Sequence, residues 1–216
     1  MTGVQTCALP ICYWSIPADE PTALNGTWKE GPGRDFFHVL RQRFGDEEGK
    51  LPFVAEDLGV ITDDVRAVME AFDLPGMKVL QFAFGENMPE NPYIPHMHRQ
   101  NSVAYIGTHD NNTTIGWWDE DARTAERTNF LRYAGMEGSP SPSSSDVLRA
   151  MTRMLLASTA NLVVLTAQDV LGLDGSARMN IPSTTAGNWT WRLKETDALK
   201  ARSAPKIGRA SCRERV

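Results

Sequence analysis

Short apolar runs alternate with amphipathic segments along most of the chain, and this alternation limits the fold more than any other feature. Several of the runs have the length and apolar character of buried strands. The four predicted strands are Leu51–Ala55, Lys78–Phe84, Ser102–Thr108 and Asn161–Thr166. Strands separated by helices are typical of a parallel sheet whose faces are covered by helices. The sequence therefore predicts the α/β class.

Four helices are predicted around these strands: Arg34–Phe44, Asp63–Phe72, Ala122–Tyr133 and Asp146–Ala157. All but Ala122–Tyr133 have a clear apolar face. In the first helix, Phe36, Phe37 and Phe44 have helical spacing and are expected in the core. Thr62 is the expected N-cap of the second helix. Further residues expected to face inward are Val65, Val68, Met69, Phe72, Val147, Met151, Met154 and Leu155.

Three segments have no clear periodicity and are expected to be irregular. Asn87–Asn101 is rich in proline, asparagine and histidine, and long loops of this kind often carry function. Gly138–Ser145 has the composition of a flexible connector. Ala177–Leu193 contains the aromatic sequence GNWTWR.

Polar residues follow each predicted strand rather than precede it. In a parallel α/β barrel, the chemistry lies at these carboxyl-terminal strand ends. Four strand–helix units correspond to half of an eight-stranded barrel, so we expect a partial (β/α)8 barrel. An open doubly wound sheet is the competing fold, but no glycine-rich phosphate loop follows any of the strands.

The composition excludes several classes of function. The chain of 216 residues has a net charge of −5 and a pI near 5.4, whereas nucleic-acid-binding surfaces are basic. No apolar run approaches the roughly 18 residues of a membrane-spanning helix. Three cysteines fit neither a disulfide scaffold nor a four-ligand zinc site. We therefore expect a globular intracellular protein whose partners are neither nucleic acid nor membrane.

The two ends of the chain differ from the rest. Residues 1–12 begin with MTGVQTCALPI, residues 206–216 are KIGRASCRERV, and both segments resemble translated sequencing-adapter DNA. Neither segment has helical or strand periodicity, and the first lacks the charged start of a secretory signal. We expect both segments to be derived from adapters, and residues 13–205 to be the native part.

Glu56 and Asp110 are the leading candidates for catalysis. Each comes just after a predicted strand, so both are expected at the same end of the barrel. Two carboxyl groups at one site push their pKa values apart, and one of them can then remain protonated as an acid. Glycosidic bond cleavage needs such an acid together with a carboxylate. The alternative is structural, with both residues as helix N-caps or salt-bridge partners.

A metal site is a weaker hypothesis. His109 lies next to Asp110, and His96 and His98 have a His-x-His spacing that could ligate zinc. However, the His-x-His pair lies in a proline-rich loop, and only His38, on a helix, is left as a further ligand. A serine or cysteine nucleophile has no G-x-S-x-G sequence to support it. We expect no metal and no cofactor.

Four tryptophans lie near the polar strand ends. All four are expected in loops: Trp117 and Trp118 follow the third strand, and Trp189 and Trp191 belong to the irregular segment. Aromatic faces in clefts stack on sugar rings, which favours a carbohydrate substrate. The alternative is that each indole only holds its own loop in place.

A series of motifs covers Tyr13–Leu199. In chain order they are YWSIPA, TALNGTWKEGPG, AEDLGVITDDV, LPGMKVLQFAF, NPYIPH, YIGTHDNNTTIGWW, QDVLGL, ARMNIP and GNWTWRL. Together they resemble the amylomaltase family, the 4-α-glucanotransferases or disproportionating enzymes of the α-amylase clan. The order and length of the motifs make this resemblance specific.

The resemblance implies roughly strands 5–8 of a (β/α)8 barrel and a retaining mechanism that uses three carboxyl groups. Glu56, in AEDLG, matches the general acid/base after the fifth strand. Asp110, in GTHDN, matches the transition-state stabiliser after the seventh strand. Asp57 is expected to support Glu56 rather than to act itself.

Four further residues match positions that bind substrate in the family. His109 and Asn111 match groups that hold sugar hydroxyls, Phe82 matches a residue on the acceptor side, and Asn180 matches a position in the cleft. Asn112 stands where an aspartate is common, a change that should not remove activity.

The family's nucleophilic aspartate lies in an Arg-x-Asp-His segment before YW-IPA, and the sequence contains no such segment. We expect a cytoplasmic parent enzyme that transfers segments of α-1,4-glucans and maltooligosaccharides, with Glu56 acting first as acid and then as base. We expect the chain alone to be inactive. The alternatives are a fragment of an α-glucan hydrolase of the same clan and a non-catalytic α-glucan-binding fragment.

Overall fold

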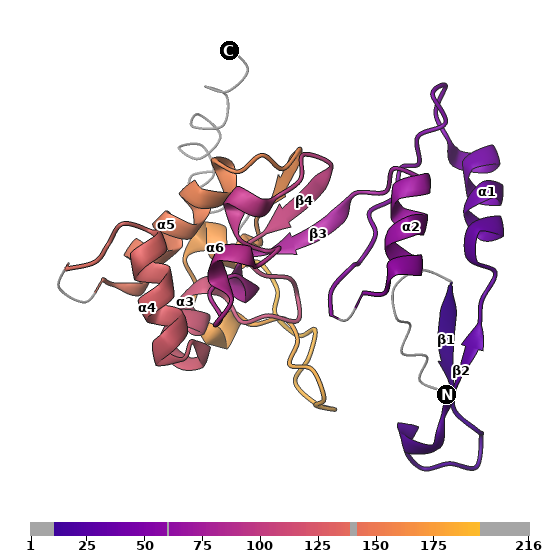
Figure 1. Cartoon of the computed structure of the whole chain (residues 1–216). Coiled ribbons are helices and arrows are strands. Elements are labelled where there is room, and N and C mark those ends of the chain that lie inside the picture. The colour runs from indigo at the N-terminus through magenta and orange to yellow at the C-terminus, as the bar shows by residue number, and fades with distance from the viewer. Residues whose placement is uncertain (1–10, 60, 139–141, 195–216) are drawn as a thin grey trace. The chain divides into compact units, whose positions relative to one another are not determined.

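A computed structural model describes residues 11–59, 61–138 and 142–194 (Figure 1). The chain divides into two compact units. Unit 1 comprises Met1–Met77 with Asn101–Val103, and unit 2 comprises Lys78–Gln100 with Ala104–Val216. Each unit has a hydrophobic cluster of its own.

Unit 1 contains a hairpin that was not predicted. Strands β1 (Cys12–Ser15) and β2 (Thr27–Glu30) pair antiparallel, with Trp14 opposite Trp28. The two indole rings meet edge to face, with their centroids 5.3 Å apart. Between the strands lies a short 3-10 turn, η1 (Ala23–Asn25). The strands are too short to produce a recognisable alternating pattern in the sequence.

Helices α1 (Gly33–Phe44) and α2 (Asp63–Ala71) confirm the first two predicted helices. Thr62 is the N-cap residue of α2, as predicted, although its side chain makes no cap hydrogen bond to the helix backbone. The rings of Phe37 and Phe72 join the two helices at 5.3 Å. The buried cluster of unit 1 consists of Phe37, Leu51, Ala55, Val68, Phe72 and Leu74.

Phe36 and Phe44 are outside this cluster, so their expected place in the core is wrong. Their exposed fractions are 41% and 57%. Consecutive helix positions are rotated by about 100°, so Phe36 lies beside the face that carries Phe37 and touches that ring only by its edge. Phe44 lies in the last turn of α1, where its ring meets that of Phe53 at 6.0 Å.

Leu51–Ala55 is not a strand, which corrects another prediction. Leu51 and Ala55 are buried, and the N–H of Ala55 donates to the carbonyl of Pro75 over 2.8 Å, but the segment forms no strand ladder. Pro52 has no N–H to offer a neighbouring strand. The apolar residues of this segment therefore reflect its burial and not pairing within a sheet.

The other three predicted strands are present in shortened form. They are β3 (Gly76–Val79), β4 (Ser102–Tyr105) and β5 (Leu162–Val164), and they form a parallel sheet in the order β3-β4-β5 (Figure 1). The run predicted to continue β3 instead forms a 3-10 turn, η2 (Leu80–Phe82). The α/β class is confirmed, whereas the partial barrel stays a prediction.

The connection from β4 to β5 carries the main helices of unit 2. Helices α4 (Thr124–Tyr133) and α5 (Ser144–Leu156) confirm the two predicted there, and α6 (Ala167–Leu171) follows β5. Ser143 caps α5, because its hydroxyl accepts the N–H of Asp146 and the Asp146 carboxylate accepts the N–H of Ser143. The buried residues of α5 are Val147, Leu148, Met151, Thr152 and Leu155.

Trp117 and Trp118 are buried, so they do not lie in an open loop as expected. Two further elements, α3 (Thr114–Gly116) and the π-helical turn η5 (Trp117–Asp121), turn both indoles into the core of unit 2. The ring of Trp118 packs against Phe130 at 5.5 Å. The burial of both indoles favours the structural alternative for this pair.

The predicted loop at Asn87–Asn101 is confirmed, since it contains only the short 3-10 turns η3 (Met88–Glu90) and η4 (Pro95–Met97). After one more 3-10 turn, η6 (Gly175–Ala177), the rest of the segment Ala177–Leu193 is also irregular, as predicted.

Two predictions fall partly or mostly outside the described residues. Within the expected connector Gly138–Ser145, residues 139–141 are not described, and α5 already begins at Ser144. Of the expected adapter segments 1–12 and 206–216, only Ile11 and Cys12 are described.

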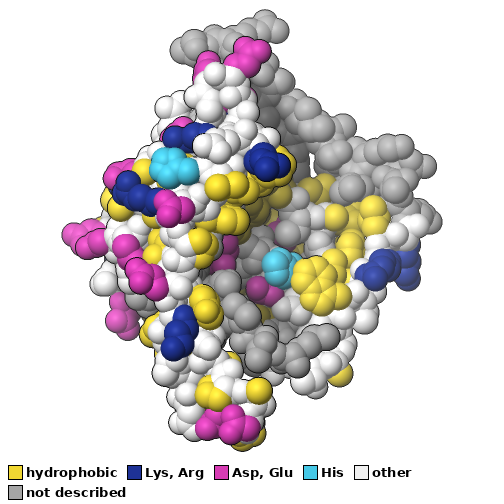
Figure 2. Space-filling model, turned by 90° about the vertical axis from the view of Figure 1, so that its right-hand side faces the viewer, with side chains coloured by type: hydrophobic (Ala, Val, Ile, Leu, Met, Phe, Trp, Pro, Cys, Tyr) yellow, Lys and Arg dark blue, Asp and Glu magenta, His cyan; other side chains and the backbone are white. Residues whose placement is uncertain are grey.

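Hydrophobic side chains are exposed among the charged ones on the face drawn in Figure 2. Over all the described residues, on whichever face they lie, the most exposed large hydrophobic side chains are Leu24, Phe44, Val39, Trp28, Trp189 and Leu162. In the part of the chain that the structure describes, no helix combines the length and the hydropathy needed to cross a bilayer.

Candidate functional site

The tight turn after β4 carries Asp110. Oδ1 of Asn111 accepts hydrogen bonds from the backbone N–H and the hydroxyl of Thr108, each over 2.9 Å. Oγ1 of Thr108 also accepts the N–H of Asp110 over 3.3 Å. Short polar side chains that bond to nearby backbone groups stabilise such turns. The polar residues that follow this strand therefore build the turn as well as the site.

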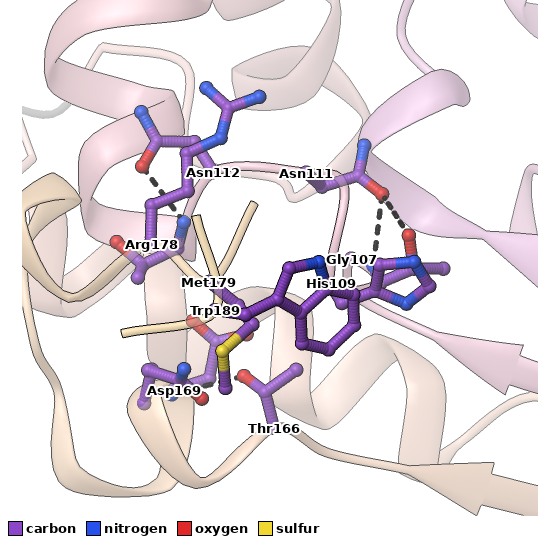
Figure 3. A pocket seen from close by; sticks show the side chains of 12 residues that line it. Gly107, His109, Asn111, Asn112, Thr166, Asp169, Arg178, Met179 and Trp189 are labelled. Carbon is purple, nitrogen blue, oxygen red and sulfur yellow. Dashed lines mark hydrogen bonds between the residues drawn. The ribbon is translucent and has the colours of Figure 1, made fainter. Parts of the chain in front are cut away.

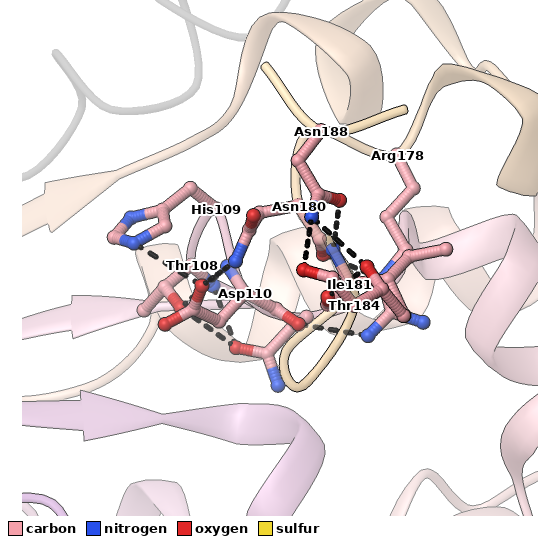
Figure 4. A network of polar contacts seen from close by, with 9 residues as sticks. Thr108, His109, Asp110, Arg178, Asn180, Ile181, Thr184 and Asn188 are labelled. Atoms are coloured by element: carbon pink, nitrogen blue, oxygen red, sulfur yellow. Dashed lines mark hydrogen bonds and ion pairs between the residues drawn. The ribbon is translucent and has the colours of Figure 1, made fainter. Parts of the chain in front are cut away.

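Three side chains hold Asp110 (Figure 4). Its Oδ1 accepts a hydrogen bond from Nδ2 of Asn180 over 2.6 Å and lies 3.3 Å from Nε2 of His109. Its backbone carbonyl accepts a hydrogen bond from Nη2 of Arg178 over 2.8 Å. The carboxylate is still half exposed. Asp110 thus has an anchored side chain that solvent or a ligand can reach.

A cavity of about 240 Å³ lies beside this turn (Figure 3). Its lining includes His109, Asn111, Thr166, Asp169, Arg178 and Trp189. The rings of His109 and Trp189 have centroids 4.9 Å apart and planes inclined by 38°. Trp189 is 53% exposed, which leaves part of the indole available for stacking, as a sugar ring would require.

A second cavity of about 300 Å³ brings together Phe82, Asp110 and Asn111. Phe82 is 43% exposed and therefore presents an apolar surface there. The same cavity is lined by Arg123 and Glu126, whose side chains are 3.0 Å apart. Their hydrogen bond lowers the pKa of Glu126 and raises the pKa of Arg123, so both are charged at neutral pH.

Buried hydrogen bonds stabilise the segment Asn112–Thr114, which follows the Asp110 turn. Nε2 of Gln81 donates to the carbonyl of Asn112 over 2.9 Å, and Oδ1 of Asp169 accepts the N–H of Thr114 over 2.7 Å. Nδ2 of Asn112 donates to the carboxylate of Glu120 over 3.3 Å. An aspartate at position 112 would face Glu120 without a donor, so the asparagine suits this environment.

Glu56 and Asp57 belong to unit 1. Oδ1 of Asp57 accepts the N–H of Met77, in β3, over 2.6 Å. Oε1 of the exposed Glu56 accepts the N–H of Leu58 over 3.1 Å. Asp57 therefore anchors its segment to the first residues of β3. Because Asp110 belongs to unit 2, the predicted pairing of Glu56 with Asp110 stays a prediction.

His96 and His98 do not share a ligand position. The ring nitrogens of His96 lie 3.1 Å from the Tyr133 hydroxyl and 3.1 Å from the Pro89 carbonyl. Nε2 of the buried His98 lies 2.9 Å from the Tyr93 carbonyl. These two histidines fasten the loop, and the described residues contain no cluster of three or more His, Cys, Asp or Glu suited to a metal ion.

Arg178 was missed in the sequence, although it lies two residues before the predicted Asn180. Besides Asp110, it binds the carbonyl of Asn180 through Nε over 2.9 Å and approaches the carboxylate of Asp121 to 3.7 Å. Its charge and its place in the ARMN motif were the available signals. Its contact with the backbone of Asp110, across 68 positions, cannot be inferred from spacing.

Carboxylate, imidazole and amide side chains gather after a strand of this α/β chain. Enzymes with parallel sheets have their active sites at this position. Residues 11–198 match the family model described as 4-alpha-glucanotransferase, and the chain belongs to this family. It is 43% identical to the chloroplastic/amyloplastic 4-alpha-glucanotransferase of Solanum tuberosum over 87% of this chain and 31% of that protein. It is 45% identical to that of Thermus thermophilus, over 84% of this chain and 35% of that protein.

Solved structures agree with this assignment. The amylomaltase of Streptococcus agalactiae, in complex with acarbose, superposes with a TM-score of 0.81 at 30% identity, over 94% of this chain and 39% of that one. The amylomaltase of Corynebacterium glutamicum, at 14% identity and a TM-score of 0.67, supports the fold alone. The chain spans about a third of the length of the curated relatives it matches. Since the plant relative is chloroplastic or amyloplastic, the cytoplasmic location stays a prediction.

Proposed function

We propose that this chain is part of a 4-α-glucanotransferase that transfers segments of α-1,4-glucans to acceptor glucans. In this proposal it supplies roughly strands 5–8 of a (β/α)8 barrel, and residues 1–12 and 206–216 are adapter-derived. The observation that carries the proposal is the anchored, half-exposed Asp110 with His109, Asn111 and Asn180 around it. The names of the relatives, and the acarbose in the complex of one of them, support a glucan ligand.

The proposed mechanism is a retaining double displacement. Asp110 stabilises the positive charge that develops on the sugar, and its fixed Oδ1 lowers the cost of orienting it. Glu56 protonates the leaving oxygen and later deprotonates the 4-hydroxyl of the acceptor glucan. Asp57 holds the Glu56 segment through Met77, and Phe82 receives the acceptor sugar on its exposed ring. The nucleophilic aspartate belongs to an Arg-x-Asp-His segment that the sequence lacks.

A binding assay tests the sugar site. The purified chain should bind maltotriose more tightly than the β-linked cellotriose, as measured by NMR titration. Asp110→Asn keeps the shape of the side chain but removes its charge, and should weaken maltotriose binding. Equal affinity for the two sugars, or no binding of either, would count against the glucan site.

A product assay tests the catalytic part. We expect no products when the chain is incubated with maltotriose, because the nucleophile is absent. Shorter and longer oligosaccharides together would refute the inactivity. Release of glucose and maltose without longer products would favour a hydrolase of the same clan. Maltotriose binding that is insensitive to Glu56→Gln would favour a non-catalytic α-glucan-binding fragment.

A further inference from the structure

The loop after Asn180 is closed by one half-buried side chain, that of Asn188. Its Oδ1 accepts the N–H of Ile181 over 2.8 Å. Its Nδ2 donates to the carbonyl and the hydroxyl of Thr184, over 3.2 and 2.9 Å (Figure 4). Of residues 181–190, Asn188 is the least exposed. Asn188 therefore joins the two ends of a loop that has little other packing.

The loop backbone needs such support, because it has an unfavourable conformation. Ser183 and Trp189 have φ angles of +66° and +61°, a region that residues with a Cβ rarely occupy. For a residue as bulky as tryptophan, this conformation persists only where surrounding contacts enforce it. The N–H of Trp189 donates to the carbonyl of Met179 over 2.7 Å, which is one such contact. Nη1 of Arg192 donates to the Trp189 carbonyl over 2.7 Å, and the bonds of Asn188, next in the chain, add further support.

Both ends of this loop touch the turn that carries Asp110. At one end, Asn180 binds the carboxylate of Asp110 through its side chain and the carbonyl of His109 through its N–H, over 2.6 and 3.1 Å. At the other end, the Trp189 ring lies 4.9 Å from the His109 ring (Figure 3). Closing the loop therefore fixes two side chains against the His109–Asp110 pair at once.

We propose that Asn188 is a positioning residue, which holds Asn180 and Trp189 against His109 and Asp110 without touching either of the latter. The inference rests on the proposed function for the role of Asp110, but the arrangement itself is a property of this chain. A stabilising carboxylate works best when its orientation is fixed before the reaction. With Asn188 removed, the strained backbone can relax and move the indole away from His109.

The test compares Asn188→Ala with Thr185→Ala, a matched truncation of an exposed side chain in the same loop. The first readout is the NMR position of the His109 ring protons, which the nearby indole ring shifts. In Asn188→Ala these signals should move toward those of Trp189→Ala, and in Thr185→Ala they should stay in place. Asn188→Asp keeps the acceptor for Ile181 but loses the donor to Thr184, and should give an intermediate shift.

The second readout is maltotriose affinity, which should fall about threefold or more in Asn188→Ala, a loss of roughly 0.7 kcal/mol. Thermal unfolding of each variant separates a local change from a loss of fold. Unchanged His109 signals in folded Asn188→Ala would overturn the proposal, as would a shift of the same size in Thr185→Ala. If the unaltered chain binds no maltotriose, the proposed function loses support, while the His109 signals still decide the role of Asn188.

Discussion

Nδ2 of Asn180 donates a hydrogen bond to Oδ1 of Asp110 over 2.6 Å, although the two residues are 70 positions apart in the chain. The bond joins the irregular segment after η6 to the turn after β4. The bond involves only Oδ1, so Asn180 can orient the Asp110 carboxylate while Oδ2 is left outside this contact. This relation makes Asn180 the most direct probe of the site.

Asn180→Ala should weaken maltotriose binding about fivefold. A hydrogen bond to a charged group contributes about 1.5–3 kcal/mol when buried, but this carboxylate is half exposed, so about 1 kcal/mol is the better expectation. NMR titration of the purified chain measures the change. The control is Asn161→Ala, an exposed asparagine whose N–H bond to Gln100 is kept. Equal weakening in both variants would contradict a specific role for Asn180.

Asn91→Ala should disturb Phe82, which lines the cavity next to Asp110. Nδ2 of Asn91 donates to the carbonyl of Phe82 over 2.9 Å, and its Oδ1 accepts the N–H of Tyr93 over 2.9 Å. The rings of Phe82 and Tyr93 meet edge to face at 5.5 Å. We expect the NOE contacts between these two rings to weaken in Asn91→Ala. Asn87→Ala, which changes an exposed residue of the same loop, should leave them intact.

The sequence allowed the helices of this chain to be located better than its strands. Helix α5 begins after a serine cap, and its apolar face continues through the 13 residues of Ser144–Leu156. These local signals agree with its tertiary packing. In Leu51–Ala55, a buried loop and a paired strand would show the same apolar pattern. Whether the segment forms a strand depends on a neighbouring strand that its own sequence does not reveal. The residues after β4 could be chosen as candidates because the functional side chains of parallel α/β barrels lie at the carboxyl ends of the strands.

The contacts of the site could not be predicted in the same way. Arg178, Asn180 and Trp189 reach the Asp110 turn from a segment without periodicity, so no pattern sets their directions. The prediction of loops at Trp117 and Trp118 was wrong for a different reason. These residues lie in a helical turn, but two adjacent tryptophans followed by acidic residues give no helical pattern in the sequence.

Gly116→Ala should destabilise unit 2 by about 1–3 kcal/mol. A Cβ at this position would overlap the side chain of Asn112 and lie 2.7 Å from Cα of Gly175, which as backbone cannot move aside easily. The gain in helix propensity, about 1 kcal/mol, does not offset this overlap. Urea unfolding of the purified chain measures the loss. Gly85→Ala, where an added Cβ meets nothing within 4 Å, should change stability by less than about 0.5 kcal/mol.

His98 should make the stability of the chain fall in mild acid. Its ring is buried, with Nε2 bound to the Tyr93 carbonyl and Nδ1 buried without a hydrogen-bond partner. Burial lowers the pKa of His98 below its usual value of 6.5, and electrostatic interactions with Lys78 and His96 lower it further, against the opposing effect of the Tyr93 carbonyl. The folded protein therefore keeps His98 neutral at a pH where the unfolded chain binds a proton.

The sign of the effect follows from this difference. Above pH 6.5 both states are neutral at His98, so its contribution is fully present; as the pH falls from 6.5 toward the lowered pKa of the folded state, the free energy of unfolding decreases. Urea midpoints at several pH values across this window measure the decline. His98→Gln, which keeps an amide donor for the Tyr93 carbonyl, should flatten the slope. His38→Gln, a change at an exposed ring on α1, should keep it, and an unaltered slope in His98→Gln would assign the acid sensitivity to another group.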